Sequence, residues 1–287
     1  MSDKPLFILK LGGSVITEKD ENLTMKEDEI ERLTTEIAEA KNEGDFNLVL
    51  VNGAGSFGHY PVMEYDLYGP DGVKEMNEER IFGVTKVHKH VEDLNRKIWD
   101  ELEKHHIPAM PVHPSSCVVQ EDSKLVKFEI EPIKLMLENN IIILSYGDMA
   151  PDRTKSSTII SGDIILTHLG EELDADKLLV GSDIDGVFTG DPNEDSDAYL
   201  ISLINGSNLT EVIDAAGKSR KIDATGGMGG KLRSILDMKK KIRSLIFNAK
   251  TEGLTKRVLL GEEIGTVIDF IEVGEWQKYL LARDTEK

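Results

Sequence analysis

The chain has 287 residues, and its 39% of hydrophobic residues are enough to build a core, which excludes a disordered chain. Lysine and arginine total 34 against 53 aspartates and glutamates, so the net charge of −19 repels nucleic acid and anionic membranes. The single cysteine, Cys117, excludes an internal disulfide and a zinc–cysteine cluster. We find no signal-peptide pattern and no apolar run of bilayer length, so we expect a cytoplasmic protein.

Short aliphatic runs alternate with amphipathic stretches along the chain. The periodicity predicts strands at 6–9, 48–51, 109–112, 141–145, 177–180 and 244–248, helices at about 30–40, 78–105 and 232–243, a hairpin at 120–131 and a polar terminal helix at 273–287. This order predicts an α/β fold, with an open, mostly parallel sheet sandwiched between helices in three α/β/α layers. A change of pattern near 171–177 divides the chain into an N-terminal lobe, 1–175, and a C-terminal lobe, 176–287.

The first of three glycine-rich loops, Gly12-Gly13-Ser14, directly follows the first predicted strand. Glycine lets the backbone approach a ligand closely, and amides at a helix start point toward an anion. Lys10 ends that strand, where a buried ammonium is costly unless it meets a charge. The loop therefore predicts a phosphate site, with a tight turn that binds nothing as the alternative.

The second loop, Gly53 to Gly58, satisfies the dinucleotide pattern G-x-G-x-x-G, but it follows the second strand instead of the first. It also approaches the P-loop pattern, except that His59-Tyr60 stands where lysine and serine or threonine are needed. We interpret the loop as amides plus the His59 imidazole around an anionic group. The alternative is an ordinary surface or core histidine.

The third loop, 223–231, has glycines at four of five consecutive positions and ends in Lys231, which is typical of a phosphate cradle. The alternative is a flexible surface loop. Two acidic segments, with Asp163 and Asp183, lie between these loops. Each acid is either a helix cap or turn residue, or a group that orients a lysine or a ribose hydroxyl.

Taken together and in this order, the motifs resemble the amino acid kinase superfamily and, within it, the isopentenyl phosphate kinase branch. The resemblance runs from about Leu6 to Ile268. It rests on the motifs Lys10-Leu11-Gly12-Gly13-Ser14, Ser161-Gly162-Asp163, Ser182 to Val187, and Thr225 to Met228 with Lys231. The branch is indicated by Gly55 to His59, Gly12 to Thr17 with Lys19, Ser145 to Asp148 and Gly261 to Thr266. Ala54 departs from the pattern, because the branch often has glycine there.

The resemblance implies ATP-dependent phosphorylation of isopentenyl phosphate to isopentenyl diphosphate, in an archaeal-type mevalonate pathway. It also implies Mg²⁺, for which we assign no protein ligand, and a homodimer. The N-terminal lobe would bind the acceptor and the C-terminal lobe ATP. By this resemblance we assign Lys10, Lys19 and Asp163 to catalysis, with Asp163 holding Lys10 in position. We assign Ala54, His59 and Gly147 to the acceptor phosphate, and Lys10, Gly12, Gly13, Ser14, Gly55, Asp183, Gly227 and Lys231 to the nucleotide.

Other functions stay open at this point. A kinase of the same fold can use fosfomycin, a nucleoside monophosphate or a carbamate as acceptor. A non-catalytic nucleotide-binding protein has less need for three lysines around one phosphoryl group, and an NAD-dependent dehydrogenase rests only on Gly53 to Gly58. For the acceptor tail, Phe82 is the candidate pocket residue, because it lies off the stripe of Ile81, Val84, Val87 and Val91 that we expect to face the core.

Overall fold

The computed structural model describes residues 4–18, 23–69, 72–73, 75–190, 192, 195–209, 212 and 227–270. The strands are β1 (Leu6–Leu11), β2 (Asn47–Asn52), β3 (Tyr68–Gly69), β4 (Gly72–Val73), β5 (Ala109–Pro111), β6 (Val118–Glu121), β7 (Lys124–Phe128), β8 (Ile142–Tyr146), β9 (Asp148–Asp152), β10 (Ser156–Ile160), β11 (Lys177–Ser182), β12 (Leu203–Ile204), β13 (Ser244–Asn248) and β14 (Thr266–Ile268). The helices are α1 (Gly13–Ile16), α2 (Glu27–Glu43), α3 (Ser56–Glu64), α4 (Glu78–Lys104), α5 (Pro114–Cys117), α6 (Glu131–Glu138), α7 (Gly162–Glu172), α9 (Gly227–Leu236) and α10 (Leu254–Leu259).

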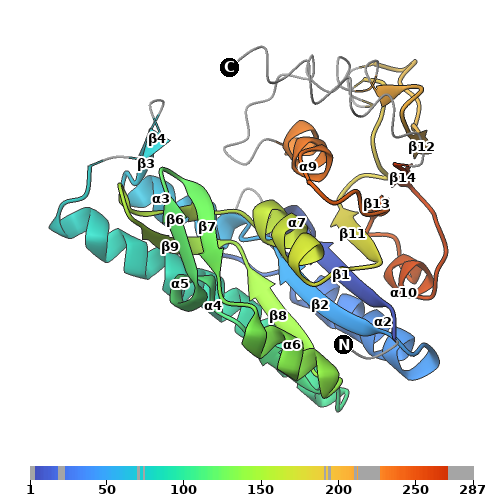
Figure 1. Cartoon of the computed structure of the whole chain (residues 1–287), viewed down its shortest axis with the longest axis horizontal. Coiled ribbons are helices and arrows are strands. Elements are labelled where there is room, and N and C mark those ends of the chain that lie inside the picture. The colour runs from blue at the N-terminus through green and yellow to red at the C-terminus, as the bar shows by residue number, and fades with distance from the viewer. Residues whose placement is uncertain are drawn as a thin grey trace.

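An open sheet runs through the centre of the molecule in the strand order β12-β14-β13-β11-β1-β2-β8-β5 (Figure 1). The pairing is parallel throughout except between β13 and β14. The central strands are continuous runs of aliphatic residues because both of their faces are covered.

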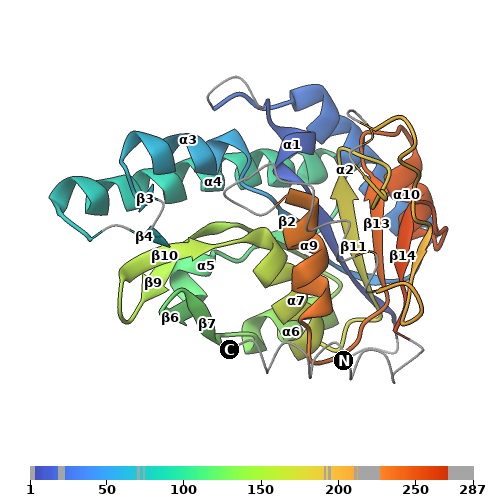
Figure 2. The same cartoon turned by 90° about the horizontal axis from the view of Figure 1, so that it is seen from above.

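Alternate residues of the central strands face two separate cores. Ile8, Val49 and Val180 belong to the core that includes side chains of α6, α7 and α9. Leu9 and Leu50 belong to the other core, which includes side chains of α2, α4 and α10. Figure 2 shows α2 and α4 on the opposite side of the sheet from α6 and α7. This arrangement confirms the expected three-layer α/β/α fold.

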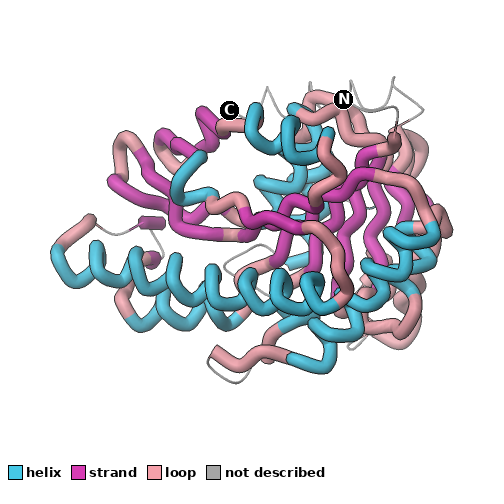
Figure 3. The backbone as a smooth tube through the Cα atoms, turned by 90° about the horizontal axis from the view of Figure 1, so that it is seen from below, coloured by secondary structure: helices cyan, strands magenta, loops and turns pink. Residues whose placement is uncertain are grey.

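A smaller sheet, in the order β10-β9-β6-β7, lies beside the large one. The long helix α4 contacts both β8 of the large sheet and β9 of the small one, and it runs along both in Figure 3. Because β9 follows β8 after the single residue Gly147, the two sheets meet at that residue.

Most elements lie where the sequence predicts them, and the hairpin predicted at 120–131 is present as β6 and β7. The helix expected at 232–243 instead begins at Gly227 and ends at Leu236. Ile81 was wrongly expected to face the core, since its side chain is 55% exposed in the first turn of α4. The helix predicted at 273–287 falls outside the described residues. None of the helices in the described part of the chain has the combination of length and apolar character needed to cross a membrane.

Candidate active site

At the carboxyl edge of the sheet, the loops that follow β1 and β2 are hydrogen-bonded to the ends of the neighbouring strands β11 and β1. The amide of Gly12 donates to the carbonyl oxygen of Gly181 at 2.8 Å, and the amide of Gly53 donates to that of Leu11 at 2.8 Å. Ligands of open α/β sheets collect at this edge, where the strands end. The first two glycine loops of the sequence thus meet where a ligand site is expected.

The two glycine loops touch so closely that neither tolerates a side chain at the contact. A Cβ on Gly13 would lie 2.4 Å from the Gly55 nitrogen, and a Cβ on Gly53 would lie 2.5 Å from the Gly13 nitrogen. Gly55 also has φ +52°, which glycine adopts at little cost. These glycines therefore serve the contact between the loops as well as any approach to a ligand.

Lys10 ends β1 as a buried cation, with its Nζ 2.6 Å from Oδ1 of Asp163 in the first turn of α7. Burial is the main cause that lowers the pKa of Lys10, the charge of Asp163 opposes this, and the nearby charge of Lys231 lowers the pKa further. The structure thus brings two of the sequence-predicted lysines and Asp163 together. Ser161, directly before Gly162, caps α7 by accepting a hydrogen bond from the Ile164 amide at 3.2 Å, so this motif includes a helix cap as well.

Gly147 connects this ion pair to the second loop. Its amide donates to the carbonyl oxygen of Asn52 at 3.3 Å. A Cβ on Gly147 would lie 3.2 Å from the Gly162 nitrogen, and a Cβ on Gly162 would lie 3.2 Å from Cε of Lys10. The Gly147 amide therefore belongs to the same small region as the Lys10 side chain.

The proposed acceptor residues lie at the start of α3. His59 is exposed to solvent, one turn after Gly55, whose carbonyl oxygen accepts from the His59 amide at 3.1 Å. The Ala54 methyl occupies space left by Gly58, because a Cβ on Gly58 would lie 2.6 Å from the Ala54 Cβ. The Oγ of Ser56 is buried and has no hydrogen-bond partner. This segment thus presents an exposed imidazole and an unsatisfied hydroxyl beside the glycine contact.

Three of the proposed nucleotide residues come from the C-terminal part of the chain. Asp183 follows β11 and is partly buried, and Gly227 and Lys231 lie in the first turns of α9. Ser14 lies in α1, where its carbonyl oxygen accepts from Nζ of Lys26 at 3.2 Å. Lys19 and residues 223–226 of the third loop fall outside the described residues.

A cluster that the sequence analysis missed lies directly behind Gly147. The buried carboxylate of Asp148 accepts from the Ser115 amide at 3.2 Å and faces Nδ1 of His88 at 3.0 Å. The hydrogen bond to Asp148 is the main cause that raises the pKa of His88. Ser115 Oγ faces the same ring nitrogen at 3.3 Å, so the three residues do not form a serine-hydrolase relay, which uses both ring nitrogens.

Two further groups of this cluster are held in their neutral forms. Burial raises the pKa of Cys117 to about 11, so its thiol stays protonated and weakly nucleophilic at neutral pH. Burial also raises the pKa of Tyr146, whose hydroxyl lies 2.6 Å from Nδ1 of His113. The cluster therefore supports the backbone beside Gly147 and offers no activated nucleophile.

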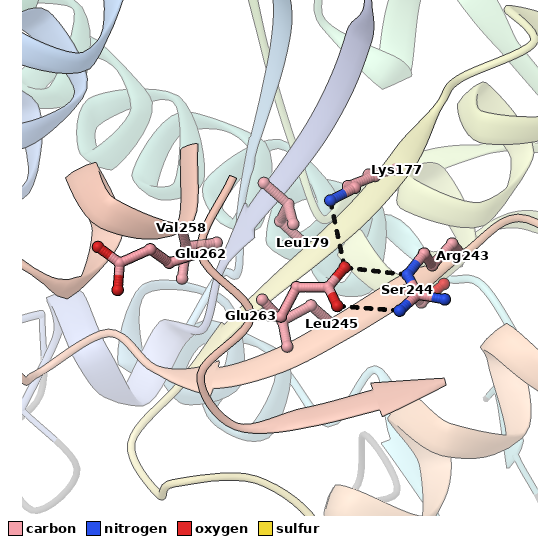
Figure 4. Close-up of a pocket in the computed structure, with 8 residues that line it drawn as sticks. All are labelled: Lys177, Leu179, Arg243, Ser244, Leu245, Val258, Glu262 and Glu263. Carbon is pink, nitrogen blue, oxygen red and sulfur yellow. Dashed lines mark hydrogen bonds and ion pairs between the residues drawn. The ribbon is translucent and has the colours of Figure 1, made fainter. Parts of the chain in front are cut away.

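A small pocket at the opposite edge of the sheet is held by an ion-pair network (Figure 4). Glu263 lies 3.3 Å from Nζ of Lys177 and 2.9 Å from Nη2 of Arg243, and mainly the hydrogen bond from Arg243 lowers the pKa of Glu263 to about 2. Its cavity of about 10 Å³ has room for about one water molecule. Lys177 and Ser244 begin their strands, so this pocket lies away from the carboxyl edge and is structural.

The described residues offer no group of three or more histidine, cysteine, aspartate or glutamate side chains placed to hold a metal ion. What the carboxyl edge does offer is lysines, backbone amides and one buried ion pair. This set is suited to binding phosphate groups by charge and by amide hydrogen bonds.

Comparison with known proteins agrees with this chemistry. The model of the amino acid kinase family matches residues 5–248. The chain is 38% identical to an isopentenyl phosphate kinase of Methanocaldococcus jannaschii, over 93% of this chain and 100% of that protein. It is 35% identical to the isopentenyl phosphate kinase of Methanothermobacter thermautotrophicus, over 90% of this chain and 97% of that protein. A crystal structure of an isopentenyl phosphate kinase superposes with a TM-score of 0.77 at 33% identity, over 92% of this chain and 100% of that one. The chain therefore belongs to the amino acid kinase family, in its group of isopentenyl phosphate kinases.

Proposed function

We propose that the chain transfers the γ-phosphoryl group of ATP to isopentenyl phosphate and so makes isopentenyl diphosphate and ADP, in an archaeal-type mevalonate pathway. The observation that carries the proposal is the buried Lys10–Asp163 pair beside Lys231, at the edge where two glycine loops meet. The relatives named above support isopentenyl phosphate as the acceptor.

The residues suit a transfer that needs no general base. A phosphate monoester is already ionised near neutral pH, so its oxygen attacks the γ-phosphorus while the bond to the ADP oxygen breaks. The obstacle is repulsion between the two anionic groups, which positive charge and oriented amides overcome. Lys10, held by Asp163, would neutralise the transferring group, and Lys231 the leaving phosphates. We assign the same role as Lys10 to Lys19 on the family resemblance alone.

The two substrates would approach from opposite sides of the glycine contact. Ala54, His59 and Gly147 would bind the acceptor phosphate through amides and the imidazole. Gly12, Gly13, Ser14, Gly55, Asp183 and Gly227 would line the nucleotide site together with the lysines. With lobes at 1–175 and 176–287, the acceptor residues all lie in the first lobe, whereas the nucleotide residues come from both, and strands of both lobes form one continuous sheet.

Mg²⁺ is proposed to arrive bound to the phosphates of ATP, since the described side chains form no metal-ligand cluster. When bound, it would supply further positive charge to the phosphate oxygens. Chelation is the test: excess EDTA should abolish turnover, and MgCl₂ should restore it.

We also propose a homodimer in the cytoplasm with no nucleic-acid or membrane partner, as the net charge of −19 favours. Large apolar side chains are exposed around edge strand β5: Trp99 on α4, Met110 on β5 and Leu135 on α6. The mass in solution, measured by light scattering, should be about twice the 31.9 kDa of one chain.

A kinetic screen tests the acceptor. ATP is combined in turn with isopentenyl phosphate, dimethylallyl phosphate, fosfomycin and UMP, and kcat/KM is measured for each. Isopentenyl phosphate should give the highest value. A higher value with fosfomycin or UMP would assign a different acceptor to the same site. Thermal stabilisation by NAD and not by ATP would instead favour the dehydrogenase interpretation.

A further inference from the structure

We propose that Thr17 is a positioning residue for phosphoryl transfer, because its side chain ties the first glycine loop to the second. This inference rests on the proposed function, since it requires that the two loops hold the two reacting phosphates. Thr17 would touch neither substrate. It would act by fixing the distance between the loops that do.

The Thr17 hydroxyl makes one hydrogen bond to each loop. Its Oγ1 donates to the carbonyl oxygen of Gly13 at 2.9 Å and accepts from the backbone amide of Ser56 at 3.2 Å. The residue is only 1% exposed, so water cannot readily replace either bond. A single oxygen atom therefore connects the start of α1 to the start of α3.

The Thr17 side chain packs directly against Gly55, with no room for a larger residue at position 55. A Cβ on Gly55 would lie 2.1 Å from Thr17 Oγ1 and 2.9 Å from its Cγ2. Gly13 contacts the backbone of Gly55 on the same side. The Thr17 side chain thus occupies the space that the glycine at position 55 leaves open, which accounts for this glycine beyond its φ of +52°.

Thr17 is itself anchored from behind. It forms an antiparallel bridge with Met25, and its neighbours Ile16 and Glu18 hydrogen-bond the backbone of Lys26 and Thr24. The second loop is therefore tied to a residue that is braced by the start of α2.

The reaction depends on this distance because the attacking oxygen and the phosphorus must approach to about 3–3.5 Å, and a displacement of about 1 Å costs about 100-fold in rate. Thr17→Val keeps the shape of the side chain and removes both hydrogen bonds. We expect kcat to fall at least about tenfold, with the KM for ATP changed by less than about threefold. Thr17→Ser keeps the hydroxyl and should stay within about threefold of wild type in kcat.

Thr34→Val is the matched control. Thr34 is fully buried, and its hydroxyl donates to the carbonyl oxygens of Ile30 and Glu31 within its own helix. The loss of this buried hydroxyl, which lies away from the glycine loops, should leave kcat unchanged. A purely structural role for Thr17 would move the melting temperature alone.

Thr17→Ala and Thr17→Ser form a second comparison if the valine variant does not fold, since they differ only in the hydroxyl. A kcat ratio of at least about five between serine and alanine supports the proposal. Equal kcat values in that pair, or wild-type kcat in a folded Thr17→Val, would overturn it. If wild type prefers a different phosphorylated acceptor, the proposed function fails in its acceptor, and the Thr17 comparison is made with that acceptor.

Discussion

The ammonium of Lys10 and the carboxylate of Asp163 form a nearly water-free ion pair, with side chains that are 6% and 10% exposed. The lysine ends the central strand β1, and the acid lies in the first turn of α7. Burial alone would favour the neutral amine, and the Lys231 charge adds to that tendency. Asp163 thus favours the charged form of Lys10, which the proposed phosphate binding requires.

Asp163→Asn should therefore move the pH at which activity is lost. The substitution removes the negative charge that raises the pKa of Lys10, so this pKa falls further. Because the proposed mechanism uses the protonated amine, the alkaline limb of the kcat profile should shift to lower pH. The measurement is kcat against pH with both substrates saturating.

Asp174→Asn provides the control, because Asp174 pairs with Lys240 on the surface with both side chains more than half exposed. Its profile should match that of wild type. An unshifted alkaline limb in Asp163→Asn would show that the charge of Asp163 does not set the protonation of Lys10.

The central strands were predictable because burial on both faces requires unbroken aliphatic runs, as in β2 and β8. The hairpin of β9 and β10 was not predicted, since it carries Pro151 and Asp152 and pairs with β6, which is distant in the chain. Ile81 has core spacing but lies in the first turn of α4, before the helix reaches its buried stretch. Periodicity marks a face of a helix and does not show where a neighbour covers it.

The residue types of the site were predictable from the sequence, and the family resemblance implied that Asp163 holds Lys10, whereas the contact of His88 with Asp148 was not predicted. Glycines after strands and a lysine at a strand end indicate phosphate chemistry in any order of strands. In the fold, Lys10 meets Asp163 because α7 lies against β1. His88 stands between core positions of α4 and gives no signal without Asp148, to which only the folded chain brings it close.

His59→Ala should lower kcat/KM for the acceptor at least about tenfold, the scale of one hydrogen bond to a charged group. The exposed imidazole lies one turn after Gly55, on the side of the glycine contact assigned to the acceptor. The KM for ATP should hardly change. His59→Asn and His59→Gln should retain more activity than alanine, because both can still donate a hydrogen bond. Equal damage to both substrates would place His59 outside the acceptor site.

His88 should stabilise the fold more at mildly acidic than at alkaline pH. Its pKa is raised above the value of the unfolded chain, so the stabilisation is fully present below about pH 6.5 and is lost as the pH rises through the folded pKa. His88→Asn should lower the free energy of unfolding by about 1.5 kcal/mol at about pH 6 and by less at about pH 8.5. We expect the lower end of the range for a hydrogen bond between charged groups, because the His88 side chain is one-third exposed and solvent weakens the interaction.

Urea unfolding of both proteins at the two pH values measures the difference. Asp148→Asn removes the main cause of the raised pKa of His88, so in that background the cost of His88→Asn should no longer be larger at the acidic pH. If His88→Asn lowers the free energy of unfolding equally at both pH values while Asp148 is present, His88 does not gain stability by being protonated beside Asp148.

Phe82→Ala should widen the range of acceptor tails. The ring is 53% exposed at the start of α4, with its centroid 6.0 Å from that of Tyr65 and 5.0 Å from Nζ of Lys86. It is thus absent from both cores and can contact an apolar tail from the α3–α4 side. Truncation should weaken the use of isopentenyl phosphate by about 1–3 kcal/mol in kcat/KM through lost apolar contact.

The same truncation leaves room for a longer chain, so the ratio of kcat/KM for geranyl phosphate over isopentenyl phosphate should rise. Ile81→Ala is the matched control. Ile81 is about as exposed as Phe82, but as the adjacent residue of the helix it points in a different direction. Its ratio should stay at the wild-type value. If the ratio is unchanged in a folded Phe82→Ala and rises in Ile81→Ala, the tail lies against the other side of α4 and Phe82 does not limit its length.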